Sequence, residues 1–191
     1  MSDKAARKKQ YILDTAKQVF ASKGFKDVSM KDIVEACEIS RGGLYLYFDS
    51  TESILTEIIN EESSQNGFQF LEKEDENVSY GNCLALFLKE QKLEILNKKN
   101  NLTVAIYEYL FSNSEETAKA SFEKKVDLLS KLIEKGTESG EFVCDDAVES
   151  AKHVLFTLEG LKVTANTYGL SEEDMDNELV LIMSSLLADE E

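Results

Sequence analysis

Apolar residues recur three and four positions apart along most of the chain, and this spacing limits its fold more than any other feature. Such spacing places apolar side chains on one face of a helix. The 191 residues include no proline, and few segments show the alternation of a half-buried strand. The sequence therefore predicts an all-α fold of about nine helices with short connections.

The first 48 residues predict three helices, of which the last two are short and joined by a tight turn. The first covers about 6–23 and ends at Gly24, a residue suited to the left-handed conformation after a helix. Ser29 and Asp32 have the spacing of a capping box at the start of the second. Ser40 is a good N-cap for the third, over 41–48. These are the proportions of a helix-turn-helix.

Six further helices are expected in the rest of the chain, together with a loop at 66–78. They span about 51–64, 79–97, 101–112, 115–139, 146–167 and 172–188. We expect a helix-turn-helix DNA-binding domain over 1–50 and a helical ligand-binding and dimerisation domain over 51–191.

Charge is divided unevenly between these two parts. Residues 1–50 carry nine basic and seven acidic side chains, a net +2, whereas residues 51–191 carry twelve basic and thirty acidic ones, a net −18. Such asymmetry indicates two roles, with nucleic acid a suitable partner for the N-terminal part alone. For the C-terminal part, an acidic surface that only aids solubility is the simpler explanation.

Composition disfavours several classes of function. His153 is the one histidine, and the three cysteines have no metal-ligand or redox spacing, so we expect no metal, no cofactor and reduced thiols in a cytoplasmic protein. No apolar run approaches the roughly 20 residues of a membrane helix, and the start lacks the apolar segment of a secretory signal. An enzyme is the least favoured class, because nucleophile motifs and phosphate loops are missing.

Residues 39–48 read ISRGGLYLYF, and two adjacent glycines are costly in a helix, about 1 kcal/mol each relative to alanine. We interpret Gly42 and Gly43 as allowing the helix backbone to approach a DNA groove closely. Arg41 can then reach guanine O6 and N7 with two hydrogen bonds. The hydroxyls of Tyr45 and Tyr47 suit phosphate oxygens, as do the basic side chains at 7–9. The alternative is that the glycines mark a tight turn and the tyrosines are core.

Residues 29–55 read SMKDIVEACEISRGGLYLYFDSTESIL, and residues 12–25 read ILDTAKQVFASKGF. Both resemble the N-terminal signature of the TetR family of transcriptional regulators, in outline TMKDIA-x-x-A-G-V-S-x-G-x-LYxHF-x-x-KE-x-L. The resemblance implies phosphate contacts from the start of the second helix and base contacts from the third. It also places Thr51 where the family commonly has lysine, so that a hydrogen bond to phosphate remains but the charge is lost. The residues expected to contact DNA are Arg7, Ser29, Lys31, Ser40, Arg41, Gly42, Gly43, Tyr45, Tyr47 and Thr51.

The same resemblance implies dimerisation and small-molecule sensing by the C-terminal helices. Apolar stripes on 146–167 and 172–188 suit a four-helix bundle at a two-fold axis, or the core of one chain. The residues expected at the dimer contact are Leu155, Leu158, Leu179, Ile182 and Leu186. Those expected around a small hydrophobic ligand are Phe87, Tyr107, Phe111, Phe122, His153 and Phe156, unless these side chains are ordinary core.

The sequence therefore favours a homodimeric, sequence-specific DNA-binding transcriptional regulator, a repressor released from its operator by a small molecule. The competing hypothesis is an acidic helical module that binds another protein and no DNA. A gel-shift titration against the promoter region beside its own gene separates the two.

Overall fold

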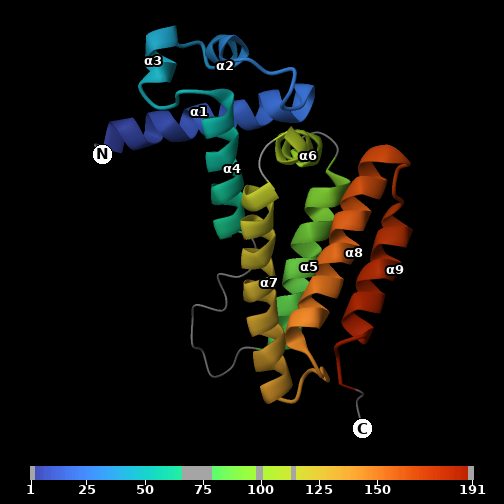
Figure 1. Cartoon of the computed structure of the whole chain (residues 1–191). Helices are drawn as coiled ribbons and strands as arrows, with labels where there is room; N and C mark the ends of the chain where they lie inside the picture. The colour runs from blue at the N-terminus through green and yellow to red at the C-terminus, as the bar shows by residue number, and fades with distance from the viewer. Residues whose placement is uncertain (1–2, 66–78, 98–100, 113–114, 189–191) are drawn as a thin grey trace. The chain divides into compact units, whose positions relative to one another are not determined.

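A computed structural model of the chain describes residues 3–65, 79–97, 101–112 and 115–188. All regular elements of these residues are helices, which confirms the all-α prediction (Figure 1). The helices are α1 (Asp3–Lys23), α2 (Met30–Ala36), α3 (Arg41–Tyr45), α4 (Thr51–Gln65), α5 (Tyr80–Leu96), α6 (Thr103–Ser112), α7 (Glu115–Glu138), α8 (Ala147–Thr167) and α9 (Glu172–Ser184). The loop predicted at 66–78 lies outside the described residues. In the described part of the chain, no helix has both the length and the apolar character to cross a bilayer.

The helices pack as two compact units, each around its own hydrophobic core. The first unit comprises Met1–Ser64 and Lys98–Glu115, and the second comprises Gln65–Asn97 and Glu116–Glu191. Helices α1 to α4 and α6 thus belong to the first unit, and α5, α7, α8 and α9 belong to the second. The predicted boundary at residue 50 between a DNA-binding and a ligand-binding domain stays a prediction. In the packing of the chain, α4 and α6 lie in the same unit as the first three helices.

The core of the first unit is made by the apolar faces of its helices. α1 contributes Ile12, Leu13 and Phe20, and Leu44 and Phe48 of the glycine-containing segment are buried with them. Each fully buried side chain of this size contributes about 1.5–3 kcal/mol to folding. This shared core positions α2 and α3 against the rest of the unit.

The predicted caps of the first unit are present. The backbone N–H of Ser29 donates to Asp32 Oδ2 at 2.9 Å, and the backbone N–H of Asp32 donates to Ser29 Oγ at 3.4 Å, which forms the capping box of α2. After α1, Gly24 adopts φ +78° and donates to the carbonyl of Phe20 at 2.8 Å. These local bonds begin and end helices where the sequence predicts.

Two helices are shorter than predicted by three residues or more. The prediction carried α3 to residue 48, but it ends at Tyr45, because the N–H of Tyr47 turns back to the carbonyl of Leu44 at 2.9 Å. α9 ends at Ser184 instead of residue 188. There the backbone pairs with the segment before α8: the N–H of Val143 donates to the carbonyl of Leu186 at 2.8 Å.

Candidate DNA-binding site

The short helix α3 presents most of the residues predicted to contact DNA. It begins at its N-cap Ser40, whose Oγ accepts a hydrogen bond from the N–H of Gly43 at 3.1 Å. Leu44 anchors the opposite side of the helix in the core and is fully buried. α3 packs against α2, so that the pair forms a helix-turn-helix.

The two glycines of α3 lie within the helix and not in a turn. Neither has a positive φ, so the backbone conformation does not require glycine at either position. Outside its own helix backbone and chain neighbours, a Cβ on Gly42 would meet no described residue within 4 Å, whereas a Cβ on Gly43 would lie 3.1 Å from Ser40 Oγ. The helix cap therefore explains in part why residue 43 is a glycine. For Gly42, neither the backbone conformation nor the packing of the described residues requires a glycine.

The side chains around these glycines differ in exposure. Arg41 is exposed, with its guanidinium 5.5 Å from the centre of the Tyr45 ring. Tyr45 is itself 39% exposed, so it is not a core residue. Tyr47 is half-buried and packs against the core of the first unit. The alternative that both tyrosines are core residues therefore holds in part for Tyr47 and fails for Tyr45.

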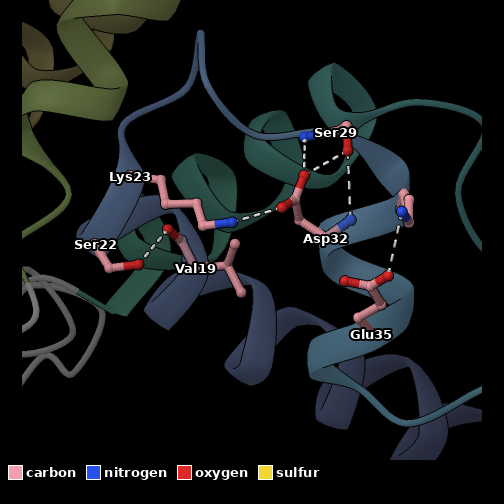
Figure 2. Close-up of polar contacts among 7 residues, drawn as sticks. Val19, Ser22, Lys23, Ser29, Asp32 and Glu35 are labelled. Carbon is pink, nitrogen blue, oxygen red and sulfur yellow. Dashed lines mark hydrogen bonds and ion pairs between the residues drawn. The ribbon is translucent and has the colours of Figure 1, made fainter.

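The start of α2 holds a polar cluster around Asp32 (Figure 2). Oδ2 of Asp32 accepts hydrogen bonds from the N–H and hydroxyl of Ser29, and its Oδ1 lies 2.5 Å from Nζ of Lys23 at the end of α1. The hydrogen bond from Lys23, followed by those from Ser29, holds the pKa of the Asp32 carboxyl far below its usual range. Ser29 therefore already has an internal partner, whereas Lys31 is 84% exposed and lies 3.6 Å from Glu35.

The remaining predicted DNA contacts lie on α1 and α4. Arg7 is exposed and pairs with Asp3 at 2.5 Å. Lys9, two residues further on, pairs with Glu57 of α4 and therefore belongs to the packing of the unit. Thr51 is the half-buried first residue of α4.

The residues predicted at a dimer contact lie mostly inside the second unit. Four of the five, Leu155, Leu158, Ile182 and Leu186, are at most 5% exposed, and Leu179 is partly buried against them. Within this chain, therefore, the apolar stripes of α8 and α9 form part of the core, as the second of the two explanations above expected. The exposed apolar side chains of the two helices lie at other positions.

The residues predicted to surround a ligand do not form one cluster within a unit. Tyr107 and Phe111 stack on α6 in the first unit, with ring centres 6.0 Å apart. Phe122 and Phe156 stack between α7 and α8 in the second unit, 5.3 Å apart. Phe87 is buried in the core, whereas His153 is exposed and Phe156 is 62% exposed. Their role in ligand binding stays a prediction.

An open groove of about 800 Å³ runs along α4 in the first unit. Every lining side chain carries a polar group, and none belongs to the predicted ligand set: Ser50, Glu52, Ser53, Thr56, Glu57, Asn60, Glu61 and Tyr109. A small hydrophobic ligand is poorly matched to such a lining.

Sequence reasoning missed two residues of this unit. Glu108 is the one charged residue of α6, and its carboxylate reaches the turn between α1 and α2, more than 80 positions earlier in the chain. A single charge in an otherwise uncharged helix was the available signal. Glu38, in the turn before α3, has φ +52°. It occupies the place of the glycine in the A-G-V-S part of the family signature.

The arrangement of α2 and α3, with an exposed arginine at the start of the second helix, has the geometry of a helix-turn-helix DNA-binding protein. Comparison with known proteins extends this result. The model of the tetR family of bacterial regulatory proteins matches residues 12–58, and a tetracyclin repressor-like C-terminal domain matches residues 83–176. The chain belongs to the TetR family of transcriptional regulators, which are DNA-binding proteins and not enzymes.

Relatives of known sequence and structure agree with this assignment. The HTH-type transcriptional regulator YfiR of Bacillus subtilis is 38% identical over 136 residues, which cover 69% of this chain but only 66% of YfiR. QacR of Staphylococcus aureus is 25% identical over 169 residues, 86% of this chain and 89% of QacR.

Among solved structures, reduced NemR of E. coli has a TM-score of 0.78 at 18% identity, covering 96% of this chain and 100% of NemR. FadR of Bacillus subtilis in complex with stearoyl-CoA has a TM-score of 0.74 at 21% identity, covering 92% of this chain and 98% of FadR. At these identities the likeness is one of fold.

Proposed function

We propose that this chain is a homodimeric cytoplasmic repressor that binds an operator through α3 and leaves it when a small hydrophobic ligand binds the second unit. The observation that carries the DNA-binding part is Gly42. Alanine at this position would favour the helix by up to about 1 kcal/mol, and its methyl group would clash with none of the residues that the structure describes. The use of glycine here is therefore explained by a partner outside the chain that comes close to α3.

The neighbours of Gly42 indicate what kind of partner this is. Arg41 presents a planar, charged fork suited to the guanine edge in a major groove. Lys31 on α2 and Arg7 on α1 are exposed, and each is paired with a nearby carboxylate, Glu35 and Asp3 respectively. Both side chains can neutralise DNA phosphates once they leave these carboxylates. The local excess of positive charge in residues 1–50 supports this role although the whole chain is acidic.

Exposed apolar side chains on α8 and α9 support a dimer. On α8, Phe156 and Val163 are 62% and 46% exposed, and Gly160 lies between them on the same face. On α9, Val180 and Leu181 are each 61% exposed. Gly160, like Gly42, has open space at its Cβ position, which would allow a helix of a second copy to pack closely. We therefore assign the dimer contact to this face instead of the buried leucines.

The effector is proposed as an apolar molecule held among the helices of the second unit. Phe87 and Phe122 remain candidates, because they are buried or half-buried among apolar neighbours. The fatty acid metabolism regulator of Bacillus subtilis is 25% identical over 182 residues, 92% of this chain and 90% of that protein. Stearoyl-CoA, present in the FadR crystal structure, is therefore a reasonable first probe.

The experiment begins with selection of duplexes from a random-sequence library by the purified protein. A shared, roughly palindromic motif and a gel shift that resists nonspecific competitor DNA are the expected results. Recovery of random sequence, with no competitor-resistant shift, would contradict DNA binding and favour the protein-interaction module.

The dimer and the switch are measured separately. Light scattering at micromolar concentration should give twice the mass of the chain, and Leu181→Asp should give the monomer mass. A wild-type monomer would refute the dimer. The affinity for the selected duplex is then measured with and without stearoyl-CoA. A probe that stabilises the protein thermally and leaves DNA affinity unchanged would refute release by that pocket, since coupling between two sites must be reciprocal.

A further inference from the structure

The carboxylate of Glu108 on α6 closes over the turn between α1 and α2. Its Oε2 accepts hydrogen bonds from the backbone N–H of Phe25 at 2.7 Å and of Lys26 at 3.0 Å. Both amides follow the last helical bond of α1, which Gly24 makes to Phe20. One side chain of α6 thus binds two consecutive backbone N–H groups just beyond the end of α1.

Gly24 makes room for this carboxylate. Its φ of +78° is a conformation that other residues rarely adopt, and a Cβ at this position would lie 2.6 Å from Glu108 Oε2. The sequence feature that ends α1 therefore also admits a side chain from a helix far along the chain.

The next residue of α6 holds two other parts of the same unit. The Tyr109 ring meets Phe25 edge to face, with ring centres 5.3 Å apart. Its hydroxyl lies 3.1 Å from Oγ1 of Thr56 on α4. Tyr109 is only 8% exposed, so most of this side chain is buried within the unit. Through adjacent residues, α6 fixes the α1–α2 turn and α4 together.

The opposite side of the turn is tied to α2. Lys23, at the end of α1, reaches Asp32 in the capping box of α2 (Figure 2). The turn held by Glu108 therefore leads directly into the helix that supports α3. In the chain, α6 stands between α5 and α7, both of which belong to the second unit.

We infer that Glu108 is a positioning residue for DNA binding: it clasps the backbone of the α1–α2 turn and so makes the orientation of the helix-turn-helix depend on α6. This inference rests on the proposed DNA-binding function. Glu108 itself touches no DNA. Loss of its carboxylate frees the turn and lets α2 and α3 sample orientations that fit an operator less well.

The test compares Glu108→Ala, Glu108→Gln and the control Glu90→Gln, which removes an equal charge from an exposed position on α5. Affinity is measured for the duplex selected by the wild-type protein and for nonspecific DNA of equal length. Glu108→Ala should bind the selected duplex about tenfold or more weakly, given the strength of hydrogen bonds to a carboxylate. Its nonspecific affinity should match that of Glu90→Gln, and Glu108→Gln, which keeps an acceptor oxygen, should recover part of the loss.

Hydrogen exchange at the Phe25 and Lys26 amides provides the second measurement, on the full chain without DNA. Both amides should exchange slowly in the wild type and in Glu90→Gln, and at least about tenfold faster in Glu108→Ala. A folded Glu108→Ala with wild-type operator affinity would overturn the inference, as would equal losses on both DNAs. If Glu108→Ala does not fold, Glu108→Gln takes its place in both measurements. If the wild type selects no duplex, the proposed DNA-binding function fails. In that case, equal exchange rates of the two amides in the wild type and in Glu108→Ala would still refute the inferred role of Glu108 in holding the turn.

Discussion

Replacing Gly42 by alanine separates a role in folding from a role in DNA binding. The added methyl group points into open space and the backbone is already helical, so helix propensity alone sets the change in folding free energy. Near the start of a helix of this length the gain should be about 0.5–1 kcal/mol. For a chain of this size such a gain corresponds to a rise in melting temperature of roughly 1–4 °C.

The effect on DNA binding should have the opposite sign. A methyl group projects about 1.5 Å from the backbone. If the α3 backbone lies against the groove, that group must push the helix away and lengthen the hydrogen bonds of Arg41. We expect at least about tenfold weaker binding to the selected duplex, or roughly 1.4 kcal/mol. Fluorescence anisotropy at fixed salt measures this affinity, and a thermal melt of the same sample measures stability.

Gly43→Ala is the matched comparison. Its Cβ would lie 3.1 Å from Ser40 Oγ, so strain in the helix cap should cancel much of the gain in propensity. A more stable Gly42→Ala with unchanged DNA affinity would refute the close approach of α3 to DNA. A less stable one would show that an internal contact requires the glycine.

Three further predictions concern neighbouring positions. Arg41→Ala should weaken binding to the selected duplex by roughly 1–3 kcal/mol and relax preference at one base pair; competition with single-base variants measures it, and an equal loss on all sequences would make Arg41 a backbone contact. Glu38→Gly should stabilise the protein by about 0.5–1 kcal/mol in urea unfolding, because it relieves a positive φ of 52°; a loss would mean that the Glu38 side chain is needed. Asp32→Asn should destabilise the protein at neutral pH, because the pKa of Asp32 is held low by Lys23 and Ser29. That stabilisation is present above the unfolded pKa of roughly 3.9 and is lost as pH falls through the folded value, so the two unfolding curves should converge in acid; parallel curves would exclude the cluster as the cause.

Local chemistry made much of this fold predictable from sequence. Ser29 and Asp32 are three residues apart, and Gly24 follows directly after α1, so the hydrogen bonds that begin and end these helices join near neighbours. The apolar spacing likewise marks which face of a helix is buried, because a helix repeats every 3.6 residues. Arg41 and Gly42 stood out for the same reason: their helix could be located from adjacent residues alone.

Contacts between distant residues could be decided only by the tertiary structure. The apolar stripes of α8 and α9 look alike whether they pack in one chain or between two, and the buried positions of Leu158 and Ile182 answer that question for one chain. α6 belongs to the first unit, where its Glu108 meets a turn more than 80 positions earlier. The sequence by itself determined most of the helices and their caps, because these depend on neighbours within a turn or two. Which helix holds the helix-turn-helix in place was decided by the packing of the whole unit, since no local pattern records which distant backbone group a carboxylate will bind.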